Sequence, residues 1–252
     1  MLAFTWTSAK QMIAPAPGAR ADRPPAAGAM HLHTVGSAAE ARRAVEAGVD
    51  VVVAQGWEAG GHVWDQLATL PLVPAVVDAA AQVPVIAAGG VADGRGLAAV
   101  LMLGAQAVWM GSRFVAAEEA FTHDEYRRRV VDAHGEDAVH TLCFDGAWSH
   151  AAHRVVRNST LAAWQAAGGP PAPNRPGEGG VVAVDAAGRE HLRYEDLMPL
   201  PGLTGDLEAM ALYAGQSAGL IHDVMPAADI IRRTVAEAEA ALAGLEGQRS
   251  AR

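Results

Sequence analysis

The chain has 252 residues, 51% of them apolar, and a formal net charge of −9. This length suffices for one large α/β domain, or for a domain with a lid, and for a sizeable apolar core. No run of Lys or Arg is dense enough to follow a nucleic-acid backbone, so the charge argues against an electrostatic nucleic-acid binder. We expect small-molecule chemistry instead.

The number of cysteines and the sequence of the N-terminus indicate where in the cell the protein is expected. The single cysteine, Cys143, excludes an internal disulfide and a Cys-x-x-Cys metal site, and no metal-ligand pattern is completed around His150 and His153. Residues 1–10 show no basic segment followed by an apolar one, and the apolar stretch 97–110 is too short to span a bilayer. We expect a cytoplasmic protein without a metal centre, signal peptide or membrane helix.

Strand and helix patterns alternate from about residue 31 to residue 116, which predicts right-handed βα units and a parallel sheet. Five apolar segments have the character of strands in such a sheet: residues 2–5, 32–35, 51–56, 85–88 and 107–110. A closed barrel of this type needs eight. The fold class we predict is therefore α/β, a TIM-barrel-type parallel sheet that is incomplete.

Polar caps mark two helices between these strands. Ser37 with Glu40 forms a predicted capping box for the first helix. Asp93 is the predicted N-cap of a second helix over residues 97–103. Each helix is followed by a glycine, which is a common helix stop.

Prolines and glycines mark the irregular parts of the chain. Residues 70–74 contain two prolines and predict a loop before a helix over residues 75–81. Residues 145–200 are rich in Gly, Pro and Trp and predict a small lid, whose one periodic piece is a helix over residues 151–167.

The C-terminal segment predicts an amphipathic closing helix that follows Pro226. Its apolar residues recur at helical spacing: Ile231, Val235, Ala238, Leu242 and Leu245. We accordingly divide the chain into a partial barrel (residues 1–144), a lid or insert region (145–205) and a C-terminal helical segment that returns to the barrel (206–252).

Glycines follow three of the predicted strands, at residues 56, 89–90 and 111, and the first continues into Glu58-Ala-Gly-Gly-His62. Glycine lets backbone N–H groups approach a phosphate closely, and parallel α/β folds bind ligands at the C-terminal ends of their strands. The pattern predicts a phosphate-cofactor site with one histidine beside it. The alternative interpretation is that these glycines only make tight turns between strand and helix.

The motifs Gln55-Gly-Trp-Glu-Ala-Gly-Gly-His62, Ala87-Ala-Gly-Gly90 and Met110-Gly-Ser-Arg-Phe114 resemble those of the nitronate monooxygenase family, formerly called 2-nitropropane dioxygenases. Leu212-Tyr-Ala-Gly-Gln-Ser-Ala-Gly219 also resembles a segment of that family. The resemblance implies an FMN-dependent TIM barrel. It covers roughly residues 28–240, and it implies barrel strands four to eight, with residues 1–7 as the fourth strand and nothing that matches the first three.

The resemblance also implies roles for individual residues. His62 would be the catalytic base that removes the α-proton of a nitroalkane, and its other interpretation is a plain loop residue. Gln55 would bind the isoalloxazine edge or a substrate oxygen. The FMN phosphate would lie on the backbone N–H groups of Gly89, Gly90, Gly111 and Ser112. The remaining candidate FMN-binding residues are Gly56, Gly60, Gly61, Gly215, Gln216 and Ser217.

Three functions follow from these motifs. The first is oxidative denitrification of alkyl nitronates or nitroalkanes with O2, giving a carbonyl compound and nitrite. The second is an FMN-dependent reductase resembling enoyl-acyl-carrier reductases, which needs a nicotinamide donor. The third is a catalytically silent, truncated barrel that binds a partner, since an open parallel sheet exposes an edge that another copy of the chain could cover.

Overall fold

A four-stranded parallel sheet forms the first half of the molecule. The structure is a computed structural model that describes residues 30–63, 65–146 and 150–250. The sheet has the strand order β1-β2-β4-β5, and its strands are β1 (Leu32–Val35), β2 (Val51–Gln55), β4 (Val85–Ala88) and β5 (Ala107–Trp109). These strands confirm four of the five predicted from the sequence. The fifth, over residues 2–5, lies outside the described residues.

Helices α1 (Ala38–Glu46), α2 (Thr69–Ala80) and α3 (Gly94–Met102) connect these strands. Ser37 and Asp93 are confirmed as N-caps, but the predicted capping box is formed only in part, because the Glu40 carboxylate bonds to Gly36 in place of Ser37. The Ser37 side chain accepts a hydrogen bond from the Glu40 N–H, and the Asp93 side chain accepts one from the Gly96 N–H. The Glu40 carboxylate accepts the Gly36 N–H at 2.8 Å. Buried apolar side chains of the sheet and of α1 and α2 form one core cluster, in which Val52, Leu72 and Val76 are fully buried.

The predicted loop over residues 70–74 is wrong, because α2 begins at Thr69 and includes both prolines. Pro71 occupies the third helical position, and the first backbone bond of the helix is the one from the Leu72 N–H to the Ala68 carbonyl. A missing N–H at Pro71 therefore costs no helical hydrogen bond. Only Pro74 removes a backbone hydrogen bond from within the helix. The burial of Leu72, Val73 and Val76 stabilises the helix around it.

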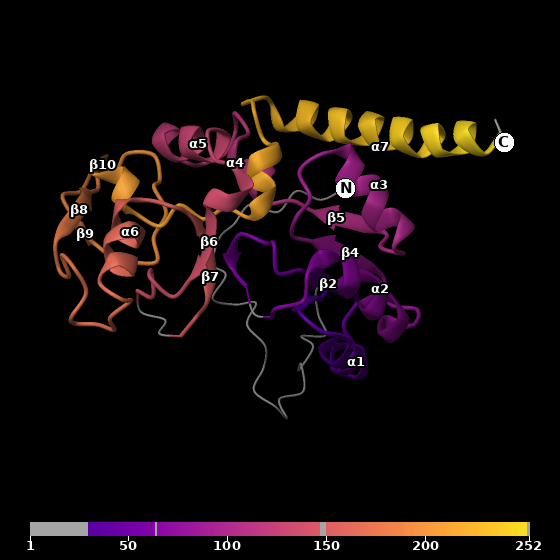
Figure 1. The fold of residues 1–252 in the computed structure, drawn as a ribbon, viewed down its shortest axis with the longest axis horizontal. Helices are drawn as coiled ribbons and strands as arrows, with labels where there is room; N and C mark the ends of the chain where they lie inside the picture. Colours follow the sequence, from indigo (N-terminus) through magenta and orange to yellow (C-terminus); the bar gives the residue numbers. More distant parts are fainter. Residues whose placement is uncertain (1–29, 64, 147–149, 251–252) are drawn as a thin grey trace.

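A second sheet is antiparallel and stands beside the first (Figure 1). Its strand order is β3-β7-β6, with β3 (Gly61–His62), β6 (Ala138–Thr141) and β7 (His153–Val156). The prediction of a helix over residues 151–167 is therefore wrong in its first half. All four residues of β7 are buried, as in a central strand covered on both faces, and Asn158 caps the shorter helix α6 (Ser159–Ala166). His150 and His153 thus do not share a helix face.

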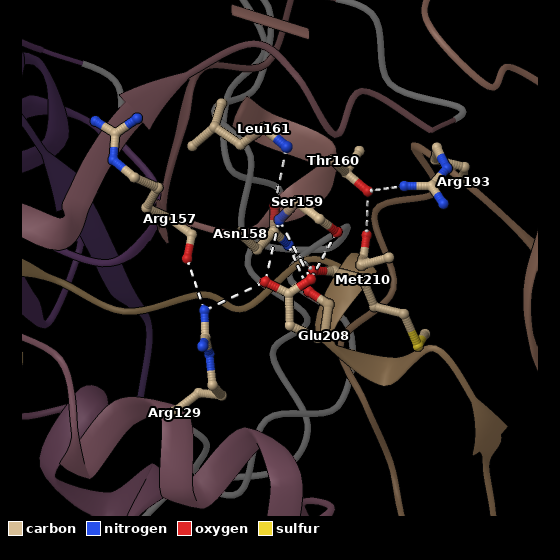
Figure 2. Close-up of polar contacts among 10 residues, drawn as sticks. Arg129, Arg157, Asn158, Ser159, Thr160, Leu161, Arg193, Glu208 and Met210 are labelled. Carbon is tan, nitrogen blue, oxygen red and sulfur yellow. Dashed lines mark hydrogen bonds and ion pairs between the residues drawn. The ribbon is translucent and has the colours of Figure 1, made fainter. Parts of the chain in front are cut away.

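A third, small sheet lies at the far end from the parallel sheet (Figure 1). Its antiparallel strands are β8 (Val181–Val184), β9 (Glu190–Leu192) and β10 (Thr204–Gly205), in the order β10-β8-β9. After the last of these strands, a polar network joins η3 (Leu207–Ala209) to α6 (Figure 2): Asn158 Nδ2 donates to the carbonyls of Glu208 and Met210, and the Ser159 hydroxyl donates to the Glu208 carboxylate. The role of this region as a lid and the predicted domain limits remain predictions.

Short helices connect these sheets to the closing helix. They are α4 (Ser112–Val115), α5 (Asp124–Val131), η2 (Gly135–Asp137), η3 (Leu207–Ala209) and η4 (Gln216–Leu220). Among the described residues, no helix combines the length and apolar character that a membrane span requires.

The predicted closing helix is confirmed as α7 (Ala227–Ser250), which packs along α3 (Figure 1). Its buried face differs from the prediction by part of a turn: Ile230, Thr234 and Ala238 are buried, whereas Val235 is 41% exposed. A close approach of α3 explains the shift. A Cβ atom added at Gly94 would lie 2.3 Å from the Glu237 Cβ, so the two backbones nearly touch here.

Candidate active site

The loop between β2 and β3, residues 56–60, is the centre of the candidate site. Gln55 ends β2, and its Nε2 donates a hydrogen bond of 3.0 Å to the backbone carbonyl of His62. The side-chain amide of Gln55 therefore closes the loop at its base. A role of Gln55 toward a flavin edge remains a prediction.

Two glycines of this loop are required by backbone packing. A Cβ atom at Gly56 would lie 2.0 Å from the Thr69 Oγ1, and one at Gly60 would lie 2.3 Å from the Gly215 N. Gly61 has a φ of +71°, in the left-handed region that favours glycine. Packing and backbone conformation alone thus explain why these positions are glycines. A contact with a cofactor would be a second reason.

The end of β4 lies against the same loop. Gly89 and Gly90 have φ values of +95° and +72°, and a Cβ atom at Gly89 would lie 3.0 Å from the backbone N of Ala59. The Glu58 carboxylate accepts hydrogen bonds from the backbone N–H and the hydroxyl of Thr69, and this hydroxyl lies 3.1 Å from the Gly89 carbonyl. Glu58 therefore holds the loop against the start of α2.

The segment 214–217 completes the cluster. The Gly215 N–H donates to the Ser112 hydroxyl at 2.9 Å, and the Gln216 N–H donates to the Glu58 carbonyl at 2.9 Å. Ser217 is buried. Candidate residues from the ends of β2, β4 and β5 and from this late segment are thus brought together, as the motifs predicted.

Gly111 differs from its neighbours because a Cβ atom there would meet no atom within 4 Å. Among the described residues, the backbone N–H groups of Gly89, Gly90, Gly111 and Ser112 donate to no protein acceptor. Four unused donors, two of them on glycines of positive φ and one beside the open space at Gly111, have the character of an anion-binding nest. The residues therefore fit a phosphate group.

His62 lies on β3, and its ring faces two other rings. The ring centroids of His153 and Tyr213 lie 5.8 Å and 5.9 Å from that of His62. Burial lowers the pKa of His62 below its usual value, and the charge of Asp196 opposes this shift. His62 is therefore neutral at pH 7 and can accept a proton, after which Asp196 would stabilise the imidazolium.

His153, beside it, is a structural histidine. Its Nε2 accepts the Phe144 N–H at 3.2 Å, and its Nδ1 lies 2.9 Å from the Ala151 carbonyl. These partners require a neutral ring that is protonated on Nδ1. Burial lowers the pKa of His153 to about 4.

Three buried residues of this cluster were given no role in the site from the sequence: His153, Arg154 and Tyr213. The sequence signal for them was weak, because two of the three lie on a segment that resembles the start of a helix. The valine pair that follows Arg154 could have indicated a strand, because β-branched residues favour strands over helices. Among the described residues, no group of three or more His, Cys, Asp or Glu could hold a metal ion.

The fold and the site define an α/β protein of the TIM-barrel type, whose described residues contain four of the parallel strands, with glycines and unused backbone donors after β4 and β5. The model of the nitronate monooxygenase family matches residues 12–237. The chain therefore belongs to the nitronate monooxygenase family. This confirms the resemblance seen in the sequence.

The chain is also similar to individual proteins and solved structures. The chain is 34% identical to a nitronate monooxygenase of Neurospora crassa over 85% of this chain and 55% of that protein. FabK from Thermotoga maritima has a TM-score of 0.69 at 34% identity, covering 88% of this chain and 64% of that one. A nitroalkane oxidase from Streptomyces ansochromogenes has a TM-score of 0.61 at 29% identity, covering 85% and 60%. The chain spans about half the length of the Neurospora relative.

Proposed function

We propose that the chain forms the FMN-binding and proton-abstracting part of an enzyme that oxidises alkyl nitronates or nitroalkanes with O2 to a carbonyl compound and nitrite. Family membership supports the reaction type. The observation that carries the proposal is the convergence of the His62 loop with the four unused N–H donors at the ends of β4 and β5.

The fit of FMN follows from the chemistry of the donors. The N–H groups of Gly89, Gly90, Gly111 and Ser112 would hold the phosphate, since backbone donors bind an anion without a lysine. The candidate contacts around the rest of the cofactor are Gln55, Gly56, Gly60, Gly61, Gly215, Gln216 and Ser217. FMN, when bound, supplies the electron acceptor for the oxidation.

His62 would take the α-proton of a neutral nitroalkane. Its lowered pKa keeps the ring neutral at pH 7, so that one ring nitrogen carries no proton and can act as a base. The resulting imidazolium lies in the field of Asp196, which stabilises it. The hydrogen bond from Gln55 to the His62 carbonyl fixes the backbone that carries the ring. A nitronate has already lost this proton and needs no base.

Nitrite release by the FMN-loaded protein tests this function. His62→Asn is expected to lower turnover of a nitroalkane by about 100-fold or more, because it removes the base, and to lower turnover of the corresponding nitronate much less. His222→Asn is the matched control, because His222 is exposed and lies before α7. Absence of FMN-dependent nitrite from both substrates would contradict the proposal.

The two alternatives predict different results in the same preparation. A reductase of the enoyl-acyl-carrier type oxidises NADH, whereas the proposed enzyme forms nitrite without a nicotinamide. A silent barrel binds no flavin and turns over neither substrate. Size-exclusion chromatography tests the predicted homo-oligomer, and cell fractionation tests the predicted cytoplasmic location.

A further inference from the structure

Arg154 is a charged residue in the interior of the second sheet. It is 2% exposed and lies on the central strand β7. Its guanidinium donates three hydrogen bonds to backbone carbonyls: Nε to Ala59 at 3.1 Å, Nη1 to Ala138 at 3.0 Å and Nη2 to Trp57 at 2.6 Å. Two of these three acceptors belong to the loop that leads to His62.

The strand register explains how Arg154 reaches this loop. Arg154 pairs with Gly61 on β3 and with His140 on β6, while His153 pairs with His62. Directly paired residues point to the same face of a sheet, so Arg154 and His62 lie on opposite faces. Because Gly61 has no side chain, the guanidinium can pass across β3 and reach the loop from the face opposite to the base.

The contacts of Arg154 are specific to a guanidinium. Its planar group carries five N–H donors in a fixed fork, which lets it bind three carbonyls on two different chain segments at once. Its charged group lies 5.0 Å from the Trp57 ring centre, and the His140 ring lies 4.1 Å from the same ring. A lysine ammonium donates from a single point and has no planar face to stack.

Two other carbonyls of the loop accept hydrogen bonds from backbone N–H groups of the protein. The Glu58 carbonyl accepts the Gln216 N–H, and the Gly56 carbonyl accepts the Ala59 N–H. Arg154 supplies the donors for two further carbonyls of the loop, those of Trp57 and Ala59. Without Arg154, two carbonyls of the loop would lose their donors in a largely buried setting.

We propose that Arg154 is a positioning residue for His62: by holding the Trp57 and Ala59 carbonyls, it fixes the loop that sets the base in front of the substrate. This inference rests on the proposed function for the role of His62 as base. The anchoring of the loop itself does not depend on that role.

The test compares Arg154→Met, which keeps the stem and removes every donor, with Arg154→Lys, which keeps the charge. The matched control is Arg157→Met, because Arg157 is exposed and its guanidinium bonds only to Gln165 among the described residues. Two quantities are measured in the FMN-loaded protein: amide hydrogen exchange over residues 56–62, and the ratio of nitroalkane to nitronate turnover. A residue that only stabilised the fold would change both turnovers equally.

Arg154→Met is expected to accelerate exchange over residues 56–62 by about tenfold or more, without changing exchange in α3 and α7. It is also expected to lower the nitroalkane-to-nitronate ratio by about tenfold, because only the nitroalkane needs a positioned base. Arg154→Lys should give intermediate values, and it decides the matter if the Met variant does not fold. Arg157→Met should leave both quantities unchanged.

Unchanged exchange and an unchanged ratio in the Met variant, or in the Lys variant where it alone folds, would overturn the inference. So would faster exchange throughout the protein, since that indicates a general loss of stability. If the wild-type protein turns over neither substrate, the proposed function fails, and the exchange over residues 56–62 still decides whether Arg154 anchors the loop.

Discussion

The Ser112 hydroxyl accepts the Gly215 N–H at 2.9 Å, and this contact joins the end of β5 to a segment 103 residues later. Both residues are buried. Gly215 in turn lies against Gly60, since a Cβ atom at Gly215 would be 2.8 Å from the Gly60 N. Contacts within the protein therefore hold Ser112, Gly215 and Gly60 together, which is the kind of preorganisation that a cofactor site requires.

Ser112→Ala is expected to destabilise the protein by about 1–3 kcal/mol, because the buried Gly215 N–H loses its acceptor. Urea denaturation measures this change as a lower midpoint at an unchanged slope. Ser159→Ala provides the comparison, since the Ser159 hydroxyl bonds to Glu208 at the surface. An equal loss of unfolding free energy in both variants would contradict the expected larger contribution of the buried contact.

Substitution by alanine is expected to change the free energy of unfolding strongly at Gly60 and hardly at all at Gly111. Gly60→Ala places a Cβ atom 2.3 Å from backbone of segment 214–215, so the loop must move, and we expect a loss of about 2–4 kcal/mol or failure to fold. Gly111→Ala meets no atom within 4 Å and should leave the free energy of unfolding of the flavin-free protein nearly unchanged. Equal destabilisation by the two substitutions would contradict the packing described here.

Stability should fall as the pH is lowered from about 6.5 to 5. His153 has a folded-state pKa of about 4 against 6.5 when unfolded, so only the unfolded chain gains a proton in this range. Its contribution is complete above pH 6.5 and is lost as the pH falls toward 4, by about 3 kcal/mol in total. Burial also lowers the pKa of His62 and His140, which adds in the same direction.

The range above pH 5 isolates the histidines from the carboxylates. Asp93 and Asp223 also have lowered pKa values, but the ordinary pKa of an aspartate is 3.8, so their contributions are lost only at lower pH. Urea midpoints at several pH values between 5 and 7 give the measurement. A flat profile over this range would contradict the neutral, doubly bonded state of His153.

The sequence predicted the parallel half of the fold well because its signals are local. Ser37 and Asp93 cap helices through contacts three residues away, and the strand ends carry their own glycines. The errors occurred where distant packing outweighs local preference. Pro74 remains inside a helix because the helix is buried, and β7 is a strand because β3 and β6 lie on either side of it.

The candidate site was predictable only in part, for the same reason. The glycine motifs pointed to residues that do converge, including Gly60 and Gly215. The sequence could not show that Arg154 lies beneath the loop or that His153 lies beside His62, since both contacts depend on the register of β3 against β7. Likewise, the exposed position of Val235 follows from the close contact at Gly94 and not from helical periodicity.

The central claim is that the unused N–H donors at the ends of β4 and β5 bind the phosphate of FMN. Titration of the flavin-free protein with FMN and with riboflavin, which lacks the phosphate, tests it most directly through the change in flavin fluorescence. We predict that FMN binds at least about tenfold more tightly than riboflavin, and that Gly111→Ala, but not the distant Gly244→Ala, reduces this preference. Equal affinity for the two flavins would contradict the claim.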